Sequence, residues 1–247
     1  MINIQHIVFS ILFIPIAAKT QHTTVHTNLL WAGYSNTILF DKKWSLQNDV
    51  QIRTKDWADK WLLYGIRTGL SYNINKRFAA TVGFTLFEYA QYEGKDLFFK
   101  NEWRPWEEIS YHLTLKKINL LQRLRTEQRF LQQVLNNRIT NNYQYVFRLR
   151  YRFEWQFPLT KNTIKLMAGN EILVNPGYLN NSFFFDQNRT FAGIIFKLSA
   201  TSNLQCQYSK IFQWRSAMSV LEDQNVFRIN FFQQFVLRKF HRSHKIV

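Results

Sequence analysis

Charged side chains recur at every second residue in several segments of the sequence. In the clearest segment, residues 147–155, Arg148, Arg150, Arg152 and Glu154 alternate with Phe, Leu, Tyr and Trp. Guanidinium groups bind carboxylates and phosphates through charge-assisted hydrogen bonds, so such a row can form ion pairs or hold an anion. Because only an extended strand places alternate residues on opposite faces, the pattern predicts a strand with one charged face and one apolar, aromatic face.

The same alternation occurs upstream, where Arg123, Arg125, Glu127 and Arg129 are two residues apart, and it recurs at residues 64–73 and 226–231. Repeated strands of this kind are typical of transmembrane barrels, in which a wet lumen accepts charge and the outer face meets lipid. We therefore interpret the chain as an all-β protein, an antiparallel outer-membrane β-barrel.

These rows predict a ladder of charges inside the barrel, because a buried charge is stable only when it is paired. The predicted members are Arg53, Arg67, Glu102, Arg104, Arg123, Arg125, Glu127, Arg129, Arg148, Arg150, Arg152, Glu154, Glu171, Asp186 and Arg189. A barrel of this size is largely filled by its own side chains, so we expect a mostly closed lumen. A narrow anion-selective passage or a pocket for an anionic ligand is the alternative, because arginines outnumber acids in these rows.

Composition agrees with a barrel. Apolar residues make up 46% of the chain and aromatic residues 17%, yet the mean hydropathy is −0.29. Apolar residues are thus dispersed among polar ones, and beyond residue 20 no stretch approaches the ~18 apolar residues of a membrane helix. The 8 Trp, 11 Tyr and 23 Phe could form the aromatic girdles of a barrel. The alternative is an aromatic-rich soluble all-β domain.

The first twenty residues have the features of a secretory signal peptide. Residues 7–16 are nearly all apolar, and Ala17 and Ala18 are small residues near a plausible cleavage site. We therefore predict a signal peptide at 1–20, a single barrel domain at 21–240 and a short tail at 241–247. Export would place the mature chain in the outer membrane.

The formal net charge of +16 also raises nucleic-acid binding as a hypothesis, since arginines interleaved with rings suit single strands. The predicted leader and the strict alternation argue against it. In a barrel, arginines line the lumen and lysines at the rims face anionic lipid headgroups. The predicted partners are membrane lipid, these headgroups and a small anionic solute, and not nucleic acid.

One set of residues could support acyl hydrolysis. Ser110 and His112 share a strand face with Glu108, but residues two apart along a strand are ~6.6 Å apart, too far for a direct nucleophile–base hydrogen bond. A lipid hydrolase is therefore only an alternative. The single Cys206 cannot form an internal disulfide, and no histidine pair has the spacing of a zinc site. We predict no catalytic residues, no metal and no cofactor.

Eleven segments are predicted strands: 27–40, 44–53, 62–73, 78–92, 99–115, 120–133, 142–157, 163–174, 183–198, 204–215 and 226–237. Tight turns alternate with longer loops, including 93–97 and 134–141. Bacterial barrels have even strand counts, so eleven poses a difficulty. Either the first segment conceals a hairpin near Gly33 or it is not a wall strand. We predict ten to twelve strands and favour twelve.

An ordered series of motifs gives the chain a resemblance to a known family. The motifs are Trp31-Ala32-Gly33-Tyr34, Lys43-Trp44-Ser45-Leu46 with Arg53, Glu102-x-Arg104-x-Trp106-Glu107-Glu108, Arg123-x-Arg125-x-Glu127-Gln128-Arg129-Phe130, Arg148-x-Arg150-x-Arg152, Asn170-Glu171 and Phe185-Asp186-Gln187-Asn188-Arg189. Together they resemble the DUF2490 proteins and cover nearly all of the predicted mature chain. The resemblance implies an exported outer-membrane barrel of Bacteroidetes-type bacteria, and it brings no catalytic residues.

Overall fold

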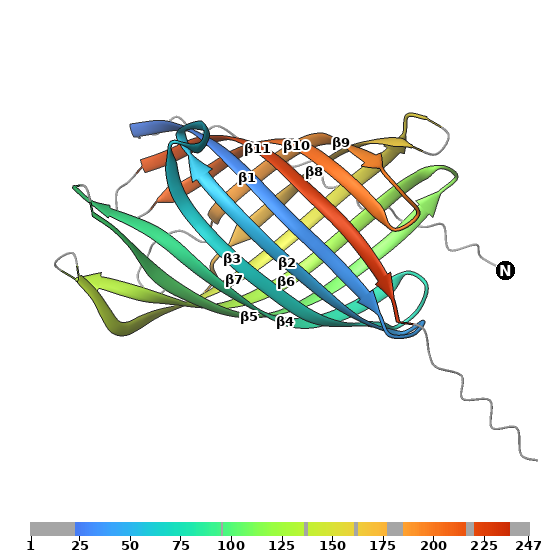
Figure 1. The fold of residues 1–247 in the computed structure, drawn as a ribbon, viewed down its shortest axis with the longest axis horizontal. Coiled ribbons are helices and arrows are strands. Elements are labelled where there is room, and N and C mark those ends of the chain that lie inside the picture. The colour runs from blue at the N-terminus through green and yellow to red at the C-terminus, as the bar shows by residue number, and fades with distance from the viewer. Residues whose placement is uncertain are drawn as a thin grey trace, which may run out of the picture.

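The computed structural model describes residues 23–94, 96–135, 138–160, 163–176, 185–215 and 220–237. Within these ranges eleven strands close into one barrel (Figure 1). The strands are β1 (Thr23–Leu39), β2 (Trp44–Lys55), β3 (Lys60–Asn73), β4 (Phe78–Glu93), β5 (Asp96–Leu115), β6 (Ile118–Leu135), β7 (Arg138–Pro158), β8 (Ile164–Val174), β9 (Phe185–Lys197), β10 (Ser202–Arg215) and β11 (Val220–Val236). The predicted signal peptide and tail lie outside the described residues.

Closure of the barrel depends on one parallel strand pair. Consecutive strands are antiparallel, whereas β1 and β11 run parallel in register from Thr23↔Val220 to Leu39↔Val236. A parallel ladder satisfies the backbone groups of both edges as an antiparallel one does, so an odd number of strands can close. The preference for twelve strands was therefore wrong. β1 passes through Gly33 without a break, so the predicted hidden hairpin is absent from the described chain and the first segment is a wall strand.

All eleven predicted strands are present, but strands continue into segments that were predicted as loops, including the described residues 220–224 of a loop predicted at 217–224. The described residues of 93–97 and 134–141 are also mostly strand, because β4 pairs with β5 up to Glu93↔Asp96 and β6 pairs with β7 up to Leu135↔Arg138. Polar strand ends continue to pair here because each cross-strand hydrogen bond satisfies a backbone group. The β4–β5 and β6–β7 hairpins extend furthest at the end where β1 begins (Figure 1). We call this end the N-end, and the end where β11 finishes the C-end.

Strand alternation separates two chemically opposite faces. Along β3, β4 and β5 the outward Ile66, Val82 and Ile109 are more than half exposed, at 57%, 59% and 53%. Their inward neighbours include Arg67 and Glu108, which pair across strands with other inward residues. No helix of the described chain is long and apolar enough to cross a membrane, and the one helical turn, η1 (Asp56–Ala58), joins β2 to β3 at the N-end.

Aromatic rings fill part of the lumen, and glycines on neighbouring strands make room for them. A Cβ atom at Gly69 or Gly83 would lie 2.6 or 2.3 Å from the Trp106 ring, closer than any real contact, so glycine is required at both positions. Trp106 is only 2% exposed. Nearer the C-end, the Thr81 hydroxyl donates a hydrogen bond of 3.0 Å to the buried Ser71 hydroxyl. Side chains therefore occupy the interior at these levels.

Candidate functional site

The Glu127 carboxylate lies at the centre of the charged lumen. Its side chain on β6 is completely buried. It accepts hydrogen bonds from Arg104 Nη1 on β5 at 3.1 Å and from Arg150 Nη1 on β7 at 2.5 Å, and Arg148 Nη1 approaches to 4.0 Å. Strand alternation produces this arrangement, because Glu127 pairs directly with Arg148 and is one inward position from Arg150. One carboxylate thus balances three guanidinium groups.

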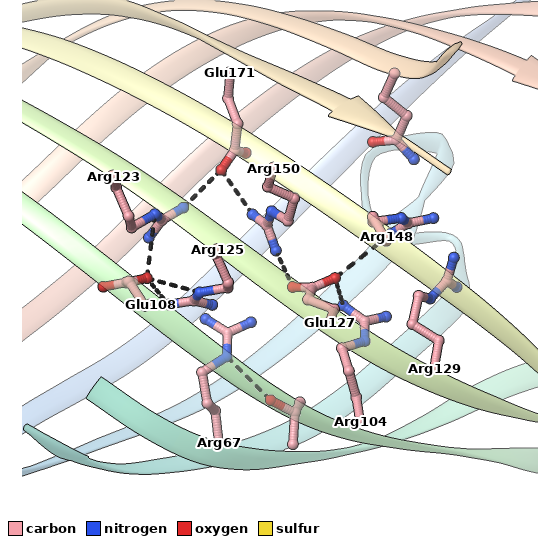
Figure 2. A network of polar contacts seen from close by, with 12 residues as sticks. Arg67, Arg104, Glu108, Arg123, Arg125, Glu127, Arg129, Arg148, Arg150 and Glu171 are labelled. Atoms are coloured by element: carbon pink, nitrogen blue, oxygen red, sulfur yellow. Dashed lines mark hydrogen bonds and ion pairs between the residues drawn. The ribbon is translucent and has the colours of Figure 1, made fainter. Parts of the chain in front are cut away.

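Glu171 on β8 repeats this arrangement one strand further round the barrel. Its Oε1 accepts from Arg123 Nη2 at 2.6 Å and from Arg150 Nη2 at 2.8 Å, and its Oε2 accepts from Arg189 Nη1 at 3.2 Å. Arg150 therefore bridges Glu171 and Glu127, as Figure 2 shows. The network links five consecutive strands, β5 to β9.

Toward the N-end, Glu102 and Asp186 supply the remaining negative charges. Glu102 accepts from Arg104 Nη2 at 2.5 Å and from Arg129 Nε at 2.6 Å. Asp186 lies 2.7 Å from Arg148 Nη2. Arg104 and Arg148 also contact Glu127, so the ion pairs of this part of the lumen are connected to the centre of the network.

Toward the C-end, Glu108 and Glu154 pair with the other arginines. Glu108 Oε2 lies 2.6 Å from Arg125 Nη2 and 3.4 Å from Arg123 Nε, and Arg152 Nη2 donates to Glu154 at 2.5 Å. Isolated ions in such positions would carry several kcal/mol of desolvation cost each, and shared carboxylates offset it. Removing one acid would leave its arginines without compensation, so the network is sensitive to loss of a carboxylate.

The opposite wall of the lumen, formed by β11, β1, β2 and β3, is different. Arg53 on β2 donates only to the Gln51 amide oxygen, at 3.0 and 2.7 Å, and its guanidinium stacks 3.8 Å from the Trp31 ring. Arg67 donates to the Thr85 hydroxyl and lies 4.0 Å from Asp49. Among the described residues Arg53 has no carboxylate partner, so this wall carries uncompensated positive charge.

A cavity of about 690 Å³ lies between the two walls. Its lining extends to Lys55 and Glu222 near the N-end and stops at the level of Arg123, Arg152 and Arg228. Twelve basic side chains and four acidic ones border it. This volume is within the range of small-molecule sites, about 300–1,000 Å³.

All fifteen residues predicted for the ladder have inward-facing side chains, and they fall into three groups. Eleven belong to the ion-pair network on β5 to β9, and Arg152 and Glu154 form a separate ion pair on β7. Arg53 and Arg67 lie on the other wall. Sequence reasoning left Asp49, Arg228 and the rings of Trp31 and Trp106 out of this site. Arg228 was on the polar face of a predicted strand, so the alternation of that strand could have identified it as a lumen residue. The two rings could not be identified in this way, because aromatic residues were predicted to face the lipid.

The residues considered for hydrolysis are not arranged as a triad. Glu108 is engaged by Arg125 and Arg123, and among the described residues no hydrogen bond joins the Ser110 hydroxyl to His112. In the same part of the chain, no group of three or more His, Cys, Asp or Glu side chains could hold a metal ion. The described geometry offers ion pairing and anion binding as the chemistry of the lumen.

The fold and the lumen together define a class: a closed β-barrel with a charged, ion-paired interior. Residues 28–222 match the family model described as a protein of unknown function, DUF2490. This match covers most of the sequence, and the chain belongs to the DUF2490 family. No curated protein and no solved structure matches it.

Proposed function

We propose that the protein is an outer-membrane β-barrel without catalytic activity, whose lumen is closed by its own ion pairs and rings. The outer face carries this proposal. Large apolar side chains are exposed on it all round the barrel, among them Ile52, Ile66, Trp103, Leu124 and Ile229. Such an exposed belt is far larger than the apolar patches of soluble monomers, and lipid is the solvent that matches it.

Several polar side chains on the outer face form hydrogen bonds with one another. Asn48 donates to Asn36 at 3.0 Å and accepts from Thr68 at 2.9 Å, while Glu107 accepts from Thr126 and Gln128 at 2.5 and 2.9 Å. A polar group that already has a partner costs less to place against hydrocarbon than an orphaned one. These pairs are therefore compatible with a lipid-facing wall.

The C-end has the charge expected of a rim beside anionic headgroups. Three of its hairpin connections carry paired basic residues: Lys42 with Lys43, Lys76 with Arg77, and Lys116 with Lys117. Each lysine or arginine near an anionic surface contributes about 1 kcal/mol of attraction. This arrangement supports contact with anionic lipid at that end, after export directed by residues 1–20.

Closure of the lumen follows from the contacts across it. Trp106 and Glu127 occupy the middle, and nearer the C-end the fully buried Asn230 donates to the Ser35 hydroxyl at 3.0 Å. Aqueous channels are found in barrels of about sixteen strands, well above the number here. The role best supported is a plugged barrel whose ion pairs fix the register of the strands.

The location is tested by fractionating cells that produce the full chain. We expect the protein in the outer-membrane fraction, and we expect unboiled samples to migrate differently from boiled ones on a denaturing gel. A protein that is monomeric and soluble without detergent would contradict the membrane assignment.

Closure is tested separately in planar bilayers. Protein that floats with liposomes, and is therefore inserted, should give no unitary conductance steps. Anion-selective steps that disappear on replacing Arg148 and Arg150 with alanine would instead establish a pore and overturn the plugged lumen.

A further inference from the structure

Three arginines surround Trp31 at the cavity wall. Arg53 on β2 and Arg228 on β11 are its direct cross-strand neighbours, and Arg189 approaches from β9. The guanidinium carbons of Arg53 and Arg189 lie 3.8 and 5.8 Å from the Trp31 ring. All four residues border the same cavity. Three like charges therefore converge on one aromatic ring inside a closed barrel.

These groups have hydrogen-bond donors to spare. A guanidinium has five N–H donors, and Arg53 uses two of them on Gln51. Among the described residues, no hydrogen bond or ion pair reaches Arg228, and the buried Trp31 Nε1 also has no acceptor. The Arg53 and Arg228 side chains are half-buried and line the cavity, so their spare donors are open to an acceptor that the chain itself does not supply.

The charge balance points to the same conclusion. The basic residues that border the cavity outnumber the acidic ones by twelve to four. Counting the charged groups behind the lining as well, the carboxylates of Asp49, Glu108, Glu127 and Glu154 and the Arg125 guanidinium, gives thirteen basic and eight acidic residues, an excess of five positive charges. An excess of positive charge inside a closed barrel is stabilised by an anion.

We propose that Arg53, Arg189 and Arg228 form a binding site for an oxyanion, a phosphate or carboxylate group, with Trp31 at its centre. Gln51 orients the Arg53 guanidinium and Gln187 orients that of Arg189, since each amide oxygen accepts a hydrogen bond from its arginine. Fixed guanidinium forks bind planar or tetrahedral oxyanions in bidentate fashion. The cavity has room for a small organic molecule that carries such a group.

The ligand of this site is a water-soluble molecule rather than a membrane lipid. Every neighbouring strand pair is joined by backbone pairing, including the β1–β11 seam, so no lateral opening exists along the described wall. The cavity lining instead extends to the strand ends at the N-end. The inference rests on the proposed function only for the side of the membrane from which the ligand enters.

The site is tested with inorganic phosphate and the full-length protein in zwitterionic detergent. Phosphorus NMR line broadening should show saturable binding to the wild type. Replacing Arg53 and Arg228 together, R53Q/R228Q, should raise the dissociation constant on the order of 100-fold, about tenfold for each lost charge-assisted contact. The matched control R77Q removes one charge from an exposed turn at the C-end and should bind as the wild type does.

Two further measurements keep the result interpretable. The double variant should fold, with a urea midpoint equal to or above that of the wild type, because the replaced arginines repel each other and lack carboxylate partners. Phosphate binding in nanodiscs should be the same with and without anionic phospholipid. Competition by that lipid would instead identify a lipid headgroup as the ligand and overturn the proposal that the ligand is water-soluble. Equal phosphate binding by wild type and double variant, or no binding by folded wild type, would refute the site. Either outcome in a protein that still inserts in membranes leaves the barrel assignment standing.

Discussion

Replacing Glu127 with glutamine is expected to lower the free energy of unfolding by about 3–5 kcal/mol, the range for breaking a buried ion pair by removing one partner. The reason is geometric. Glu127 is completely buried, it accepts from Arg104 and Arg150, and Arg148 lies 4.0 Å away. Glutamine has nearly the same shape but no charge, so the three guanidinium groups lose their shared counter-ion. Urea unfolding in detergent, followed by tryptophan fluorescence, measures the change.

Two matched variants separate this effect from general damage. E107Q changes a neighbouring carboxylate on the outer face. Glu107 accepts hydrogen bonds from the Thr126 hydroxyl and the Gln128 amide, and the side-chain oxygen of glutamine can still accept them. The substitution should cost no more than about 1 kcal/mol. R150Q removes one arginine from a lumen with excess positive charge and should cost less than E127Q, since Glu127 and Glu171 each keep other arginines. Equal losses for all three variants would contradict the counter-ion role of Glu127.

The strands could be predicted from the sequence because their chemistry repeats with period two. The charged and apolar rows around Arg150 allowed both faces of β7 to be assigned, and the neighbouring rows did the same for β6 and β3. Strand number could not be settled in this way. The parallel pairing of β1 with β11 depends on residues almost 200 positions apart, and no local pattern distinguishes a parallel from an antiparallel partner.

The ladder residues were predictable for the same reason, but their partners were not. Periodicity shows that Arg150 faces the lumen, whereas its bridge between Glu127 and Glu171 depends on strand register and barrel curvature. Aromatic residues in the lumen were missed because a ring on a polar row conflicts with the pattern. Trp31 and Trp106 face inward because glycines or arginines beside them provide space or a cation to stack on.

Replacing Trp106 with alanine is expected to destabilise the barrel by about 3–5 kcal/mol, the usual cost of deleting a buried tryptophan side chain. The ring fills the space above Gly69 and Gly83, and the Arg125 guanidinium carbon lies 4.2 Å from its centre. Its loss removes this packing and the cation–π contact together. Urea unfolding in detergent measures the cost, and bilayer recordings show whether the vacated space conducts ions.

A second substitution tests whether packing is the cause. G69L alone should destabilise the wild type by about 1–3 kcal/mol, because its Cβ would lie 2.6 Å from the Trp106 ring. In the W106A background the same leucine enters the vacated space and should recover part of the lost stability. The two substitutions contact one another, so their effects should be strongly non-additive. Additive losses would show that Trp106 does not fill the lumen against Gly69, and the packed plug inferred from this contact would have to be abandoned.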